Sequence, residues 1–171
     1  MTALALTKTY GHEIAYREQS AAASSSAYTV WEMLIKAAEH ARNNANDWRS
    51  LTKALIEEVA VECRTPNWDG YGANPISPQA KRYAQQLIDS LPYKFPVPDP
   101  VPEADGDFSL TWDFAPGHIF TVSVNPSGML SYAGLLGEGI TRHGMEPFKG
   151  SIPKVILDSI GELCDRANPT A

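Results

Sequence analysis

A few side chains in this 171-residue sequence are of the types that acid–base chemistry uses: Asp69, Asp113, His118 and His143. Asp113 and His118 flank the turn of a predicted hairpin, and an Asp–His pair can orient a general base. A nucleophile is still needed, and Ser109 and Ser123 occur without the G-x-S-x-G elbow that exposes a nucleophilic serine. We therefore favour a turn-closing ion pair between Asp113 and His118 over catalysis.

Two further pairings are open to these residues. Asp69 and Asp113 are carboxylates beside aromatic side chains, as in glycosidases, but nothing in the sequence sets their separation. Arg142 and His143 fall in a loop predicted over 137–149, where they can bind an anion together. Neither pattern is specific, so a small hydrolase or ligand-binding protein that uses the four residues above is kept as the alternative function.

The most distinctive stretch spans residues 67–73 and reads Asn-Trp-Asp-Gly-Tyr-Gly-Ala. Gly70 and Gly72 predict a sharply folded turn, because glycine takes positive φ without steric cost. The aspartate of the stretch can accept hydrogen bonds from local backbone amides. Trp68 and Tyr71 each carry a large apolar body with a polar tip. Either Trp68 fills the core and Tyr71 caps it, or the loop offers both rings to a partner or ligand.

This stretch, followed by Pro75 and Ser77-Pro78, resembles a short motif of small bacterial proteins of unknown function. Further fragments resemble the same group: Asp105-Gly106 before a strand with Trp112, Ser131-Tyr132-Ala133, and Gly150-Ser151-Ile152-Pro153. The resemblance covers residues 65–163 and leaves out the N-terminal third. It implies one compact bacterial domain and supplies no catalytic residue.

The net charge of −6 limits the classes of partner. Unspecific binding to nucleic acid requires a basic surface, so direct nucleic-acid binding is not expected. An acidic chain suits a basic protein partner instead. Residues 1–10 lack the pattern of a signal peptide, and no apolar stretch approaches the roughly 20 residues that span a bilayer. We therefore expect a cytoplasmic protein without a membrane partner.

Two cysteines, Cys63 and Cys164, each fall late in a predicted helix, and neither lies in a C-x-x-C pair. In a cytoplasmic protein such residues are reduced and mostly buried. We expect neither a disulfide nor a metal site, and the sequence indicates no cofactor.

A second candidate surface includes part of the proline-rich segment 95–102 and the residues just after it. The segment reads Phe-Pro-Val-Pro-Asp-Pro-Val-Pro. Proline at every second position excludes a helix and a central strand, so this segment is expected to be extended, crossing the surface or running along a sheet edge. Four carboxylates in this region have no lysine or arginine nearby: Asp99, Glu103, Asp105 and Asp107. They form either a solvated acidic loop or a surface that attracts a basic partner.

Apolar residues at helical spacing predict about four helices. Thr29 and Glu32 form a capping-box pattern at the start of the first. Ser77-Pro78 gives the third an N-cap followed by proline at the first helical position. The apolar positions of the four helices lie within 29–41, 48–62, 78–91 and 152–163.

Alternating apolar residues predict three antiparallel strands within 108–114, 119–124 and 130–136, joined by two short turns. One face carries large apolar side chains toward the helices. The opposite face is rich in hydroxyl groups: Ser109, Thr111, Thr121, Ser123 and Ser131. It either meets water or receives a partner or the N-terminal segment, because small side chains permit close approach.

Together these patterns predict an α+β fold, in which about four helices pack mainly on one face of a three- to five-stranded antiparallel meander. Residues 28–167 form the single domain, after an N-terminal arm or short hairpin with an Ala/Ser-rich linker over 1–27 and before a tail over 168–171. The leading function is stoichiometric binding of another protein without catalysis, as by an inhibitor, immunity factor, antitoxin or anti-defence protein of a bacterium or phage. The expected partner-binding residues are Trp68, Asp69, Tyr71, Asp99, Glu103, Asp105 and Asp107.

Overall fold

A computed structural model describes Met33 and residues 48–167 of the chain. The elements are α2 (Trp48–Glu62), α3 (Pro78–Ser90), β1 (Asp99–Pro102), β2 (Phe108–Ala115), β3 (His118–Val124), β4 (Met129–Leu136), β5 (Thr141–Pro147) and α4 (Lys154–Ala167). The α+β class and the antiparallel sheet are confirmed, and the sheet has five strands.

The described residues hold three helices, so the expected number of about four is not reached there. The predicted helix within 29–41 lies outside this part of the chain except for Met33, which is helical and packs against the core. The expectations for residues 1–27 and 168–171 also lie outside it.

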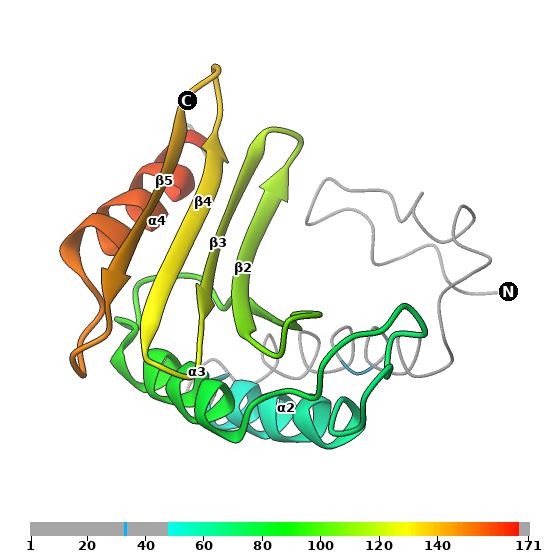
Figure 1. Cartoon of the computed structure of the whole chain (residues 1–171). Coiled ribbons are helices and arrows are strands. Elements are labelled where there is room, and N and C mark those ends of the chain that lie inside the picture. Colours follow the sequence, from blue (N-terminus) through cyan, green and yellow to red (C-terminus); the bar gives the residue numbers. More distant parts are fainter. Residues whose placement is uncertain (1–32, 34–47, 168–171) are drawn as a thin grey trace, which may run out of the picture.

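The strands follow one another in the order β1-β2-β3-β4-β5, each antiparallel to the next. Figure 1 shows β2 to β5 side by side in this order. β1 runs along one edge, as expected for a proline-rich segment. β5 forms the other edge, so the prediction of a loop over 137–149 is wrong. β5 lacks apolar alternation because most of its side chains are exposed, and its pairing with β4 sets its conformation.

The core lies on one face of the sheet. Phe108, Leu110, Phe120 and Val122 are almost wholly buried there, as the alternation predicted. Helices α3 and α4 cover this face, and side chains from both helices and from β2 and β3 surround one small cavity of about 10 Å³. Close packing of this kind excludes water from the centre of the domain.

The helix signals at Ser77-Pro78 are confirmed. The Ser77 hydroxyl oxygen accepts hydrogen bonds from the backbone N–H groups of Gln79 (3.2 Å) and Ala80 (3.5 Å), and Pro78 is the first residue of α3. Helix α2 packs against α3 and also contacts β1, which places the connection between the two helices beside the start of the sheet. None of the helices in the described ranges has the length and apolar character that a membrane span requires.

Candidate functional site

The stretch 67–73 forms a tight loop that is closed by its own polar groups. Asp69 Oδ1 accepts hydrogen bonds from the backbone N–H groups of Tyr71 (2.8 Å) and Ala73 (3.1 Å). Asn67 Oδ1 accepts one from Gly72 N (2.7 Å), and Asn67 N donates to Ala73 O (2.7 Å). The predicted sharp turn is confirmed, and these bonds fix the loop before any partner arrives.

The two aromatic residues of the loop have different surroundings. Trp68 is half-buried against the core, and its indole Nε1–H donates to Asn74 O at 2.9 Å. Tyr71 is 70% exposed. Trp68 therefore packs against the core without filling it, whereas Tyr71 is presented at the surface and does not cap the core.

The acidic turn between β1 and β2 is also closed by local hydrogen bonds. Gly106 N donates to Glu103 O (3.1 Å), Glu103 N donates to Asp107 O (3.1 Å), and Asp105 Oδ1 accepts from Asp107 N (3.1 Å). Asp105 is exposed in this turn, whereas Glu103 and Asp107 are partly buried.

The structure joins this acidic turn to the loop of residues 67–73, which we call the aromatic loop. Asn74 N donates to Ala104 O at 2.8 Å, and Ser77 N donates to Gly106 O at 2.9 Å. The backbones also meet closely, since a Cβ atom on Gly106 would lie 2.8 Å from Pro75 O. Two stretches about thirty residues apart in the sequence thus form one surface, which we call the paired-loop surface: Trp68, Asp69, Tyr71, Glu103, Asp105 and Asp107.

The carboxylates of the paired-loop surface have different electrostatic surroundings. The backbone N–H of Tyr71, followed by that of Ala73, lowers the pKa of Asp69 below its ordinary value. Partial burial, and then the negative charges of Asp105 and Glu103, raise the pKa of Asp107. Burial is thus the larger cause of the raised pKa of Asp107, and the two neighbouring carboxylates add to it.

Two of the predicted partner-binding residues are placed differently from the rest. Glu103 is half-buried, and its Oε1 accepts a short hydrogen bond from the Ser109 hydroxyl, so it is partly engaged within the sheet. Asp99 is exposed on β1, opposite Thr111 of β2, and lies on the hydroxyl-rich face and not in the turn. The paired-loop surface therefore contains six of the seven predicted residues but not Asp99.

The hydroxyl-rich face is confirmed by the strand register. Ser109 lies opposite Ser123, which lies opposite Ser131 on its other side, and the hydroxyl oxygens of Thr111 and Thr121 are 3.0 Å apart. The Thr111 and Thr121 hydroxyl groups therefore bond each other across the strands, and the Ser109 hydroxyl donates to Glu103. Ser109 is fully buried.

The Asp113–His118 pair expected across the first hairpin does not form. A register shift between Asp113 and Ala115 places Asp113 opposite Ile119, and His118 lies opposite Ala115. The His118 ring instead lies beside the turn, with Nδ1 3.3 Å from Pro116 O. Asp113 shares the face of its partner Ile119, and the neighbouring His118 points to the other face of the sheet.

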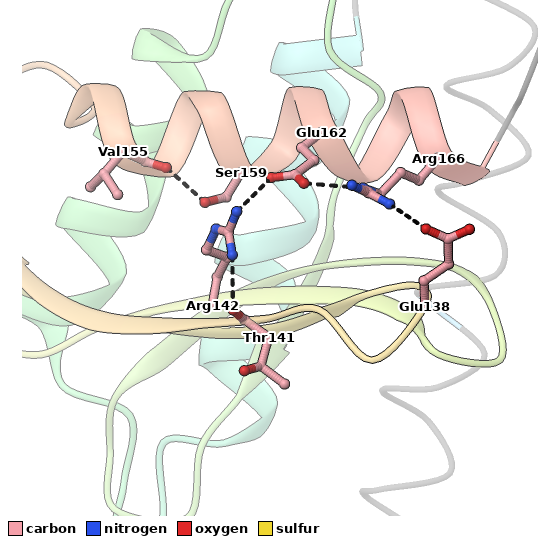
Figure 2. A network of polar contacts seen from close by, with 7 residues as sticks. All are labelled: Glu138, Thr141, Arg142, Val155, Ser159, Glu162 and Arg166. Carbon is pink, nitrogen blue, oxygen red and sulfur yellow. Dashed lines mark hydrogen bonds and ion pairs between the residues drawn. The ribbon is translucent and has the colours of Figure 1, made fainter.

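Arg142 and His143 do not form an anion site, because neighbouring residues of a strand point to opposite faces. Arg142 Nη2 donates to Glu162 Oε2 of α4 at 3.0 Å, and Arg166 bridges Glu162 and Glu138 with two contacts of 3.0 Å (Figure 2). His143 lies opposite Ala133 on the other face of the sheet. The network therefore ties β5 and the β4–β5 turn to α4.

Two hollows in the described part of the chain have linings that bear on the alternative hydrolase. A groove of about 770 Å³ lies between α4 and the segment after α3, and its lining includes Lys94, Phe95, Leu157 and Gly161. None of the four candidate catalytic residues lines this groove or the small core cavity. Among the described residues, no group of three or more His, Cys, Asp or Glu side chains is arranged to hold a metal ion.

Cys63 is buried and Cys164 is half-buried, and neither forms a disulfide in the structure. Burial raises the pKa of Cys63 to about 12, helped by the negative charges of Glu62 and Asp69. Burial also raises the pKa of Cys164. Both are thus thiols rather than reactive thiolates at neutral pH.

Sequence reasoning missed the residues that join the two loops, namely Asn74, Ser77 and Gly106. Their contacts are made by backbone atoms over a long sequence separation, so the pattern of side chains does not predict them. Comparison of the chain with family models, with curated proteins and with solved structures found no match.

Proposed function

We propose that this chain acts by stoichiometric binding of another protein through the paired-loop surface. The observation that carries the proposal is the set of hydrogen bonds from Asn74 and Ser77 to Ala104 and Gly106. They hold an exposed tyrosine and a group of carboxylates beside one another on a backbone that needs no reordering. Preformed loops bind with a smaller entropic cost than loops that must fold on contact.

The partner's surface is basic and has an apolar site for one aromatic ring. Tyr71 is the ring in this account, because tyrosine contributes large contact area with few rotatable bonds. Asp105 and Asp107 supply the charge that attracts a cationic patch. The negative charge accelerates association, and added salt weakens it. We propose that such binding serves an inhibitor, immunity, antitoxin or anti-defence role in a bacterium or phage.

Affinity capture from a native bacterial lysate, with the full chain as bait, tests this proposal. Tyr71→Ala and the double variant Asp105→Asn/Asp107→Asn are the informative baits. Asparagine keeps the side-chain oxygen that accepts the turn's hydrogen bond, so the second variant changes charge and little else. We expect one protein in stoichiometric amount on the wild-type bait and its loss from both variants.

Matched controls separate the surface from general effects of ring loss and charge. Tyr93→Ala removes another exposed tyrosine, which is 65% exposed beside Trp48. Glu58→Gln/Asp165→Asn removes the same amount of charge from helices α2 and α4. Folded control baits are expected to retain the partner. If they lose it as readily as the paired-loop variants do, or if no bait recovers a protein at any salt concentration, the proposal is wrong.

A further inference from the structure

The two edge strands of the sheet differ in the backbone groups that they turn outward. In β1, the hydrogen bond from Glu103 N to Asp107 O sets which residues face β2. Because the pattern alternates along an antiparallel pair, residues 99 and 101 also face β2, and residues 100 and 102 face outward. Both outward residues are prolines. This edge therefore offers no N–H group to another strand.

The same reasoning gives the opposite result for β5. Leu136 N donates to Ile140 O (2.8 Å) at one end of the β4–β5 pair, and Phe148 N donates to Gly128 O (2.8 Å) at the other. The register between these ends is regular. Even-numbered residues of β5 therefore face β4, while Thr141, His143 and Met145 turn their N–H and C=O groups outward. No strand of the described part of the chain pairs with this edge.

The sequence of β5 is complementary to itself in one antiparallel register. When Gly144 lies opposite Gly144 of a second copy, Arg142 lies opposite Glu146, and His143 lies opposite Met145. Opposite charges at directly facing positions stabilise a strand pair. The Arg142 guanidinium keeps donors for this contact, because its five N–H groups exceed the bonds it makes to Thr141 O and Glu162.

The ends of this register also match. Thr141 then faces Pro147 of the second copy, whose nitrogen has no hydrogen to donate. Thr141 O needs no donor from that strand, because it already accepts a hydrogen bond from Arg142 Nη1 at 3.1 Å (Figure 2). Every other outward N–H of β5 meets a carbonyl oxygen. The ion pairs of Arg142 and Arg166 hold the strand to α4, so its edge is preformed.

We propose that β5 pairs with β5 of a second copy of this chain, giving a homodimer with one continuous antiparallel sheet. Met145, which is 64% exposed, loses part of that exposure against His143 of the second copy. The paired-loop surface adjoins β1 at the far edge of each sheet, so the dimer carries one such surface at each end. Pairing through a single short strand buries a small area, so the association is reversible and depends on concentration.

Sedimentation velocity of the full chain tests this proposal, at concentrations up to about 1 mM. The informative variant is Met145→Pro, which removes an outward N–H but no hydrogen bond to β4. Its control is Met145→Ala, which loses the same side chain and keeps the N–H. We expect concentration-dependent dimers of the wild type. Proline is expected to raise the dissociation constant at least about tenfold, and alanine to raise it less than about threefold.

A second variant keeps the test valid if Met145→Pro does not fold. Glu146→Arg places a like charge opposite Arg142 of the second copy and is expected to weaken dimers in low salt more than in high salt. A wild type that stays monomeric at every concentration overturns the proposal, as does a folded Met145→Pro variant that associates like the wild type. A third outcome also overturns the proposal: the chain is monomeric, its β5 edge binds an extended segment of a different protein, and Met145→Pro abolishes that binding. The edge would then pair with a foreign strand and not with a second copy of this chain.

Discussion

Strands β1 and β5 lie at the two edges of one sheet, yet different interactions hold them. β1 packs on helix α2 and leads into a turn whose backbone is bonded to the loop before α3. β5 is tied to α4 through Arg142 and Glu162, whose side chains are 43% and 29% exposed. Backbone hydrogen bonds between loops in close contact leave little room for a change of shape, whereas partly exposed ion pairs contribute little stability. Comparable substitutions at the two edges should therefore differ in cost.

Alanine at a glycine of each edge gives the largest expected contrast. Gly106 has φ of +94°, and a Cβ atom there would meet the backbone oxygen of Pro75. We expect Gly106→Ala to lower the free energy of unfolding by about 3 kcal/mol, from backbone strain and overlap together. Gly144→Ala in β5 meets the hydroxyl end of the Tyr132 side chain, which can move, so we expect a loss below about 1 kcal/mol. Urea unfolding measures both, and equal losses would contradict the comparison.

Within the aromatic loop, substitution of Trp68 should lower the stability of the domain, whereas substitution of Tyr71 should leave the stability almost unchanged and affect binding. Trp68 is half-buried with its N–H bonded to Asn74 O, so Trp68→Ala is expected to cost about 2 kcal/mol in urea unfolding. Tyr71→Ala changes an exposed side chain and is expected to stay within about 0.5 kcal/mol. A Tyr71→Ala variant that unfolds as readily as Trp68→Ala would show that Tyr71 belongs to the core.

The ion pairs of the β5 edge should contribute less to the free energy of unfolding than is lost in Gly106→Ala or Trp68→Ala. Glu162→Gln breaks the contacts of Glu162 with Arg142 and Arg166 at once. We expect a loss of about 1 kcal/mol in low salt that shrinks as salt is added, because partly exposed charges are screened. Thermal unfolding at two ionic strengths measures the change. A loss independent of salt would assign it to packing rather than to charge.

The smallest expected effects are pH-dependent and differ in sign between two carboxylates of the paired-loop surface. The folded chain lowers the pKa of Asp69, so its contribution to stability is present above the unfolded pKa and is lost as pH falls through the folded pKa. The folded chain raises the pKa of Asp107, so the charge costs stability above the folded pKa, and the cost disappears as pH falls below the unfolded pKa.

Substitution should reveal both signs in urea midpoints recorded against pH. Asp69→Asn is expected to lower stability near neutral pH and to flatten the acid side of the profile. Asp107→Asn is expected to raise stability slightly near neutral pH. Shifts of the same sign for the two variants would contradict the opposite surroundings of the two carboxylates.

The fold was predictable where local patterns decide it. Strict alternation gave the three central strands, and the serine and proline at 77 and 78 gave the start of α3. β5 was missed because an exposed edge strand has no apolar alternation, and its glycine and charged residues are typical of a loop. Its conformation comes from pairing with β4, which a local sequence window does not contain.

The residues of the candidate site could be identified from the sequence, but their arrangement in space could not. The aromatic loop and the acidic turn were identified separately from their glycines, rings and carboxylates. Their joining depends on backbone bonds of Asn74 and Ser77 to a turn about thirty residues away. The Asp113–His118 pair does not form because Asp113 faces Ile119, and a flanking position in the sequence does not determine which residues face one another across a hairpin.

Amide hydrogen exchange of the full chain, with and without the captured protein, tests the central claim most directly. We predict that bound partner slows exchange in residues 67–77 and 103–107 together, and that Tyr71→Ala abolishes both changes. Slowed exchange confined to α4, to the groove beside it or to β5, with none in the paired loops, would contradict the claim that this surface binds the partner.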